Sequence, residues 1–156
     1  MNPAAEQNRE IERRFLIPAP PANLDLHPSR LVEQGYLASG ETTVRLRRDG
    51  ESAFVLTVKR GVFPNTEERE ALLTAAQFET LWPLTAGRRI RKTRHAIPHG
   101  PHTIELDFFH GIHEGLRIAE VEFSDTASCE TFVPPDWFGQ EITGRREYSN
   151  AALARE

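Results

Sequence analysis

The sequence lacks the marks of several common protein classes. Cys129 is its only cysteine, so no disulfide can form within the chain. No apolar run is long enough to cross a membrane as a helix, and Met1 to Asn8 show no apolar core of a secretion signal. Structural zinc spacings and a glycine-rich Walker loop are also missing. These absences favour a cytoplasmic protein that does not contact a membrane.

The chain also lacks a strong excess of either charge. Its net charge is -4 at pH 7, which gives no general attraction to nucleic acid. Hydrophobic residues make up 38% and charged residues 27% of the 156 residues, a balance that is typical of a globular protein. We predict a disordered tail over residues 1–8, followed by a single domain over residues 9–156.

Short segments that alternate charged and apolar residues are abundant. They predict a first strand that begins at Glu10 and ends before Pro18. Further strands are predicted over residues 32–38, 42–48, 53–60, 66–72, 88–97, 102–109 and 117–123. Helices are expected over residues 75–84, with Thr74 as the N-cap, and over residues 150–155. The predicted fold is therefore mainly β (α+β): an eight-stranded antiparallel barrel that forms a tunnel, with a few flanking helices.

Charged residues recur at every second position of these strands, so they share one face of each strand. They are Glu10, Glu12, Arg14, Arg45, Arg47, Lys59, Glu68, Glu70, Lys92, Arg94, Glu105, Asp107, Glu120 and Glu122. One interpretation places these charges in solvent around an apolar barrel. The other places them inside, where carboxylates bind divalent cations and arginines and lysines bind polyphosphate. Most of these strands carry charges of a single sign, which is unusual for a surface and favours the second interpretation.

The ordered set of motifs resembles the CYTH superfamily, the triphosphate tunnel metalloenzymes, over nearly the whole chain. The opening Glu10-Ile11-Glu12-Arg13-Arg14 is similar to the family motif Glu-x-Glu-x-Lys, with Arg14 in place of the usual lysine. The resemblance continues through Gln34-Gly35-Tyr36-Leu37, Val44-Arg45-Leu46-Arg47, Leu56-Thr57-Val58-Lys59, Ile90-Arg91-Lys92-Thr93-Arg94, Ile104-Glu105-Leu106-Asp107 and Ala119-Glu120-Val121-Glu122.

The resemblance implies a tunnel that binds a triphosphate together with Mg²⁺ or Mn²⁺. It implies phosphate contacts from Arg14, Arg45, Arg47, Lys59, Lys92 and Arg94. It implies that Glu10, Glu12, Glu120 and Glu122 are the leading metal ligands. It implies that Glu68, Glu70, Glu105 and Asp107 are further metal ligands or partners that orient the cations. Arg14, Lys92 and Tyr36 are the catalytic candidates, although Tyr36 is also compatible with a packing role. Trp82 and Trp137 are expected to pack rather than to stack on a base.

The activity implied by the resemblance is hydrolysis of inorganic triphosphate to pyrophosphate and phosphate. ATP and thiamine triphosphate are further possible substrates, and a homodimer is compatible with the family. One alternative is a class IV type adenylate cyclase, which uses the same tunnel to convert ATP to cyclic AMP. Two others are a polyphosphate- or nucleotide-binding module without turnover and a lipocalin-like carrier, which needs an apolar interior.

Overall fold

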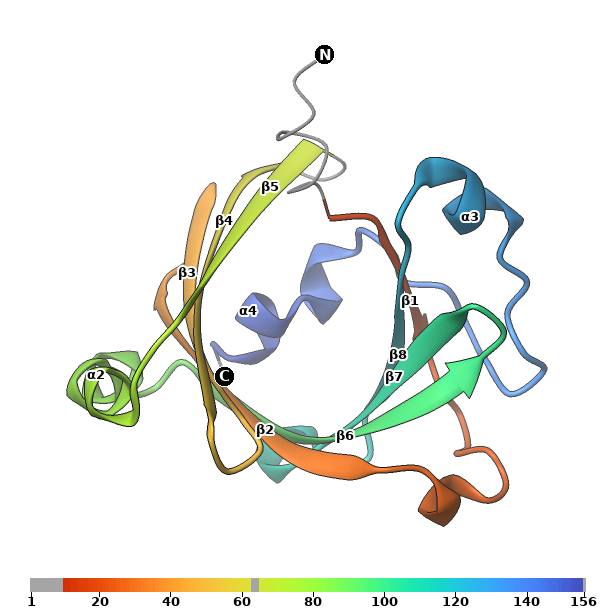
Figure 1. Ribbon diagram of the computed structural model, residues 1–156, viewed down its shortest axis with the longest axis horizontal. Coiled ribbons are helices and arrows are strands. Elements are labelled where there is room, and N and C mark those ends of the chain that lie inside the picture. Colours follow the sequence, from red (N-terminus) through yellow and green to blue (C-terminus); the bar gives the residue numbers. More distant parts are fainter. Residues whose placement is uncertain (1–9, 63–64, 156) are drawn as a thin grey trace. The chain divides into compact units, whose positions relative to one another are not determined.

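The computed structural model describes residues 10–62 and 65–155, and its strands follow the predicted alternating segments. The strands are β1 (Glu12–Leu16), β2 (Ser29–Ala38), β3 (Thr42–Asp49), β4 (Ala53–Val62), β5 (Asn65–Leu72), β6 (Arg89–His99), β7 (His102–Phe109) and β8 (Arg117–Glu122). They are hydrogen-bonded in the order β1-β8-β7-β6-β2-β3-β4-β5 (Figure 1). The pairs with a defined register are antiparallel. The predicted mainly β, eight-stranded antiparallel class is confirmed.

The helical elements are short. They are η1 (Leu24–Leu26), α2 (Ala75–Leu81), η2 (Trp82–Thr85), η3 (Gly111–His113), α3 (Thr126–Thr131), η4 (Arg146–Tyr148) and α4 (Asn150–Leu153). Thr74 caps α2 as predicted, since its hydroxyl accepts a hydrogen bond from Gln77 N. The α-helix ends at Leu81 rather than at residue 84, because Pro83 cannot donate a backbone hydrogen bond and lies in the first turn of the 3₁₀ helix η2. No helix of the described residues is long and apolar enough to cross a membrane.

Backbone contacts divide the chain into two compact units. The first contains Glu10, Leu31–Arg91 and the C-terminal segment that starts at Arg146. The second contains Ile11–Arg30 and Lys92–Arg145. The predicted single domain over residues 9–156 stays a prediction, and the predicted tail over residues 1–8 lies outside the described residues.

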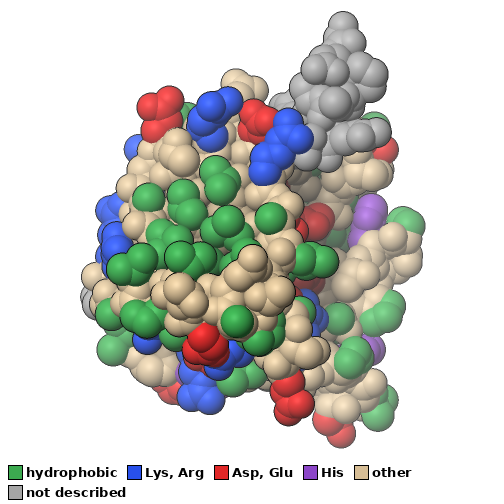
Figure 2. Space-filling model, turned by 60° about the vertical axis from the view of Figure 1, so that its left-hand side comes forward, with side chains coloured by type: hydrophobic (Ala, Val, Ile, Leu, Met, Phe, Trp, Pro, Cys, Tyr) green, Lys and Arg blue, Asp and Glu red, His purple; other side chains and the backbone are tan. Residues whose placement is uncertain are grey.

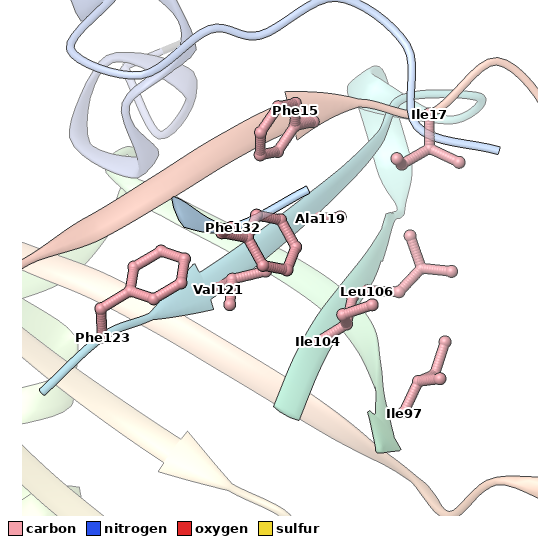
Figure 3. Packing of buried hydrophobic residues seen from close by; sticks show 9 residues of the cluster. All are labelled: Phe15, Ile17, Ile97, Ile104, Leu106, Ala119, Val121, Phe123 and Phe132. Carbon is pink, nitrogen blue, oxygen red and sulfur yellow. The ribbon is translucent and has the colours of Figure 1, made fainter. Parts of the chain in front are cut away.

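The second unit buries an apolar core on one face of its strands. The core consists of Phe15, Ile17, Ile97, Ile104, Leu106, Ala119, Val121, Phe123 and Phe132 (Figure 3). Phe132 follows α3 and lies 5.4 Å from Phe123 between ring centroids, and Trp137 contacts Phe138 at 4.7 Å. The predicted packing role of Trp137 is confirmed. Successive side chains of a strand point to opposite faces of the sheet. Since this core covers one face of β1, β7 and β8, the charged residues at the intervening positions lie on the other face.

The first unit packs α2 against β3 and β4. Phe78 of α2 is fully buried, with its ring 5.0 Å from Phe54 and stacked at 4.9 Å on Trp82. Trp82 therefore packs, as predicted. A Cβ at Gly35 would lie 2.5 Å from Thr85 Oγ1, so glycine at this position lets η2 approach β2. Figure 2 shows hydrophobic side chains gathered on the side of this unit where α2, β3 and β4 lie.

Phe78→Ala is expected to lower the free energy of unfolding by about 3–5 kcal/mol, because it leaves a cavity between α2 and β4. The matched control is Leu84→Ala, since Leu84 is 64% exposed and its loss should cost less than about 0.5 kcal/mol. Urea unfolding of the three proteins measures the difference. Equal stability of the two variants would contradict the packing described above.

Candidate functional site

The second unit places buried charges on the face of β1, β6, β7 and β8 opposite its apolar core. Arg14 lies opposite Glu120 in the β1–β8 register, and Arg94 lies opposite Asp107 in the β6–β7 register. The exposed fraction is 0% for Lys92 and 1% for Asp107. Charges that faced solvent around an apolar barrel would not be buried in this way. The solvent-facing interpretation is therefore wrong for these strands.

Arg94 is the centre of this charged face. Its Nε and Nη2 donate to the two oxygens of Asp107 at 2.7 and 2.8 Å. Its Nη1 donates to Glu105 at 2.5 Å, and Nη2 also reaches Glu120 at 3.3 Å. Burial by itself would lower the pKa of this guanidinium, but the neighbouring carboxylates, Asp107 above all, raise it well above its ordinary value. Arg94 is therefore charged at every pH at which the protein is folded.

Lys92 and Glu120 have shifted pKa values for different reasons. Burial lowers the pKa of Lys92, and its ion pair with Asp107 at 2.8 Å only partly offsets this. Burial would raise the pKa of Glu120, but Arg14, Arg94 and Lys92 lower it far below the ordinary value. Glu120 is thus a permanent carboxylate, with Arg14 Nε donating to it at 3.1 Å.

The first unit presents a second charged face on β3, β4 and β5. Arg45 Nη2 donates to Thr57 Oγ1 at 3.2 Å and lies 3.9 Å from Glu70 Oε1. Lys59 Nζ lies 2.6 Å from Glu10 and 3.9 Å from Glu68. The other predicted cation of this unit, Arg47, lies opposite Gln34 in the β2–β3 register, with its Nε 3.6 Å from Asp49. The side chains of Lys59 and Glu70 are 32% and 45% exposed, so this face is more open to solvent than that of the second unit.

Two groups of the first unit, Glu68 and Tyr36, have raised pKa values. Burial and the adjacent Glu10 raise the pKa of Glu68 to about 7, although Lys59 and Arg45 oppose the shift. Tyr36 is buried, and burial raises the pKa of its phenol. Its hydroxyl accepts a hydrogen bond from Gln34 Nε2 at 3.3 Å, which leaves the phenolic proton available for donation.

Two buried polar residues of the first unit, Gln34 and Thr57, lie beside its candidate site residues. The site predicted from the sequence does not include them. Both are 2% exposed, and both are hydrogen-bonded to candidate site residues. The signal that identifies them is their spacing, because Gln34 precedes Tyr36 by two residues and Thr57 precedes Lys59 by two.

The carboxylates best suited to a metal ion in the second unit are Glu12 and Glu122. They face each other in the β1–β8 register, and one carboxylate oxygen of each lies within 4.8 Å of the other. Glu10 stands two residues before Glu12 along the chain. This set of oxygen donors fits a hard divalent cation such as Mg²⁺ or Mn²⁺.

Curated relatives match this chain over almost its full length. The chain is 40% identical over 148 residues to an inorganic triphosphatase of Nitrosomonas europaea, covering 93% of this chain and 96% of the relative. The chain belongs to the inorganic triphosphatase family. An inorganic triphosphatase of Acetivibrio thermocellus is 34% identical over 151 residues, with 94% of each chain covered.

The inorganic triphosphatase family also contains a solved structure with the same fold. A crystal structure of an inorganic triphosphatase matches with a TM-score of 0.69 and 37% identity, covering 94% of this chain and 95% of the other. No protein-family model matches the chain. The relatives and this structure confirm the resemblance and the fold class predicted from the sequence. We expect a triphosphatase of this family to use a divalent metal, for which Glu12 and Glu122 supply suitable donors.

Proposed function

We propose that this protein hydrolyses inorganic triphosphate to pyrophosphate and phosphate with Mg²⁺ or Mn²⁺, in the cytoplasm. The observation that carries the proposal is the burial of Arg14, Lys92 and Arg94 on one charged sheet face, in a chain that is 40% identical to an inorganic triphosphatase. Arg and Lys side chains gathered on one sheet face suit a polyanion, because their N–H groups form charge-assisted hydrogen bonds with phosphate oxygens.

The proposed roles follow the two charged faces. Phosphate oxygens are bound by Arg14, Arg45, Arg47, Lys59, Lys92 and Arg94, whose charge and donors suit them. The metal ligands are Glu10, Glu12, Glu120 and Glu122, with Glu68, Glu70 and Glu105 as further ligands or as partners that orient the cations. When bound, the metal would neutralise phosphate charge and lower the pKa of an attacking water.

In the proposed reaction, the oxygen of a water molecule attacks a terminal phosphorus of triphosphate. The bond from this phosphorus to the bridging oxygen breaks, and pyrophosphate leaves with the electron pair of that bond. Arg and Lys side chains stabilise the charge that develops on the leaving oxygen. Tyr36, whose phenol has a pKa raised by burial, donates a hydrogen bond to a phosphate oxygen or orients the water. Arg14 presents a planar fork where the family has a lysine, which alters how the phosphate chain is seated.

A substrate panel tests the proposal. Purified protein is incubated with inorganic triphosphate, ATP or thiamine triphosphate and with Mg²⁺ or Mn²⁺, and both phosphate and cyclic AMP are measured. We expect phosphate from inorganic triphosphate, no cyclic AMP from ATP, and loss of all turnover in EDTA. Cyclic AMP would establish the cyclase instead, and tight binding without product would establish a binding module. The homodimer, which we infer from the family resemblance, is tested by light scattering.

A further inference from the structure

Asp107 lies in the middle of the buried charges of the second unit. Its side chain is 1% exposed, compared with 12% for Glu120 and 25% for Glu105. One oxygen accepts the Nε–H of Arg94 at 2.7 Å. The other accepts from Arg94 Nη2 at 2.8 Å and from Lys92 Nζ at 2.8 Å. Asp107 therefore joins two cations of the same strand, β6.

This geometry is unsuitable for a metal ligand. A divalent ion binds carboxylate oxygens at about 2.0–2.6 Å, so at Asp107 it would lie beside an ammonium and a guanidinium. Coulomb repulsion between cations at such distances is severe in a buried environment. Glu122 differs, since it is exposed to solvent and lies opposite another carboxylate, Glu12.

We propose that Asp107 is a positioning residue that holds Lys92 and Arg94 in place for the substrate and does not bind metal. The inference rests on the proposed function for its substrate. The bidentate contact fixes the plane of the Arg94 guanidinium, and the contact with Lys92 anchors its ammonium beside the ring of Phe109, 5.5 Å from the ring centroid. Without Asp107, Lys92 and Arg94 would still lie near Glu120, but they would lose the contact that fixes the orientation of their side chains.

The test compares Asp107→Asn with Glu122→Gln, since each change removes one negative charge and keeps the shape. Mn²⁺ binding to substrate-free protein is measured by electron paramagnetic resonance, and KM for inorganic triphosphate by phosphate release. Asp107→Asn should raise KM about 10- to 100-fold and leave the Mn²⁺ affinity within about threefold. Glu122→Gln should weaken Mn²⁺ binding by about tenfold or more. Equal loss of Mn²⁺ affinity in both variants would overturn the assignment.

A second variant covers the possibility that Asp107→Asn does not fold. Arg94→Lys keeps the charge but cannot form the bidentate contact, so it should also raise KM with unchanged Mn²⁺ affinity. A normal KM in Arg94→Lys would contradict the positioning role. The experiment distinguishes failure of this inference from failure of the proposed function. If the proposed function is wrong, the unmodified protein releases no phosphate, whereas the Mn²⁺ titration requires no turnover.

Discussion

Arg45→Ala and Arg47→Ala are each expected to raise KM for inorganic triphosphate about 10- to 100-fold, the equivalent of one lost charge-assisted hydrogen bond. Both residues lie on the charged face of β3, where Arg45 contacts Thr57 and Arg47 lies opposite Gln34. Arg45 Nε is buried and has no hydrogen-bond partner among residues 10–62 and 65–155, so a phosphate oxygen would supply one. Phosphate release at varied triphosphate concentration measures the effect.

Arg48→Ala is the matched control, because Arg48 is on the same strand but on its other face. Its guanidinium donates to Glu79 at 2.7 Å and lies 5.1 Å from the centre of the Phe78 ring. Its removal should leave KM within about twofold and cost about 1 kcal/mol of stability. Similar KM values for all three alanine variants would show that the two faces of β3 are assigned wrongly.

Glu122→Gln is expected to raise the Mn²⁺ concentration needed for half-maximal activity by about tenfold or more. The amide keeps the shape of the side chain but removes the negative charge that a hard cation requires. Glu122 is preferable to Glu120 for this test, because Glu120 also pairs with Arg14 and Arg94. Glu120→Gln should therefore raise both the metal requirement and the KM for triphosphate.

The control for this prediction is Glu130→Gln, which removes a charge from an exposed glutamate of α3 in the same unit. Its metal requirement should equal that of the unmodified protein. If Glu122→Gln shows the same metal activation curve as Glu130→Gln, Glu122 is not a ligand.

The strands could be predicted because apolar and charged residues alternate within each short segment of the sequence. The pairing of strands that are distant in sequence leaves no such local pattern. The predicted second strand begins at residue 32, since His27-Pro28 is a turn signal. The observed β2 begins at Ser29, next to Pro28, whose carbonyl accepts a hydrogen bond from Ala96 N at 3.2 Å. That partner lies in β6, so no local pattern could reveal it.

The α3 helix was missed for a different reason. Thr126–Thr131 is short and polar and contains no apolar stripe, so the period of 3.6 residues gives no signal. Its start is marked instead by Asp125, whose side chain accepts a hydrogen bond from Ser128 N at 2.7 Å. Capping alone is a weak indicator of such a short helix.

The charged faces were predictable, but the partners within them were not. Alternation places Arg94 and Asp107 on charged faces of their strands, yet only the β6–β7 register brings the two together. Likewise, Arg14 and Glu120 are 106 residues apart in sequence and meet through β1 and β8. The sequence therefore leaves Asp107 as either a metal ligand or a partner that orients the cations, and its contacts with Lys92 and Arg94 favour the second role.

The most direct test of this account is an anomalous diffraction map of crystals that contain Mn²⁺ and a non-hydrolysable triphosphate analogue. We expect a manganese peak next to Glu12 and Glu122, with phosphate oxygens in contact with Arg14, Lys92 and Arg94. Manganese bound elsewhere, with the analogue on the opposite face of β1 beside Phe15, would contradict the central claim.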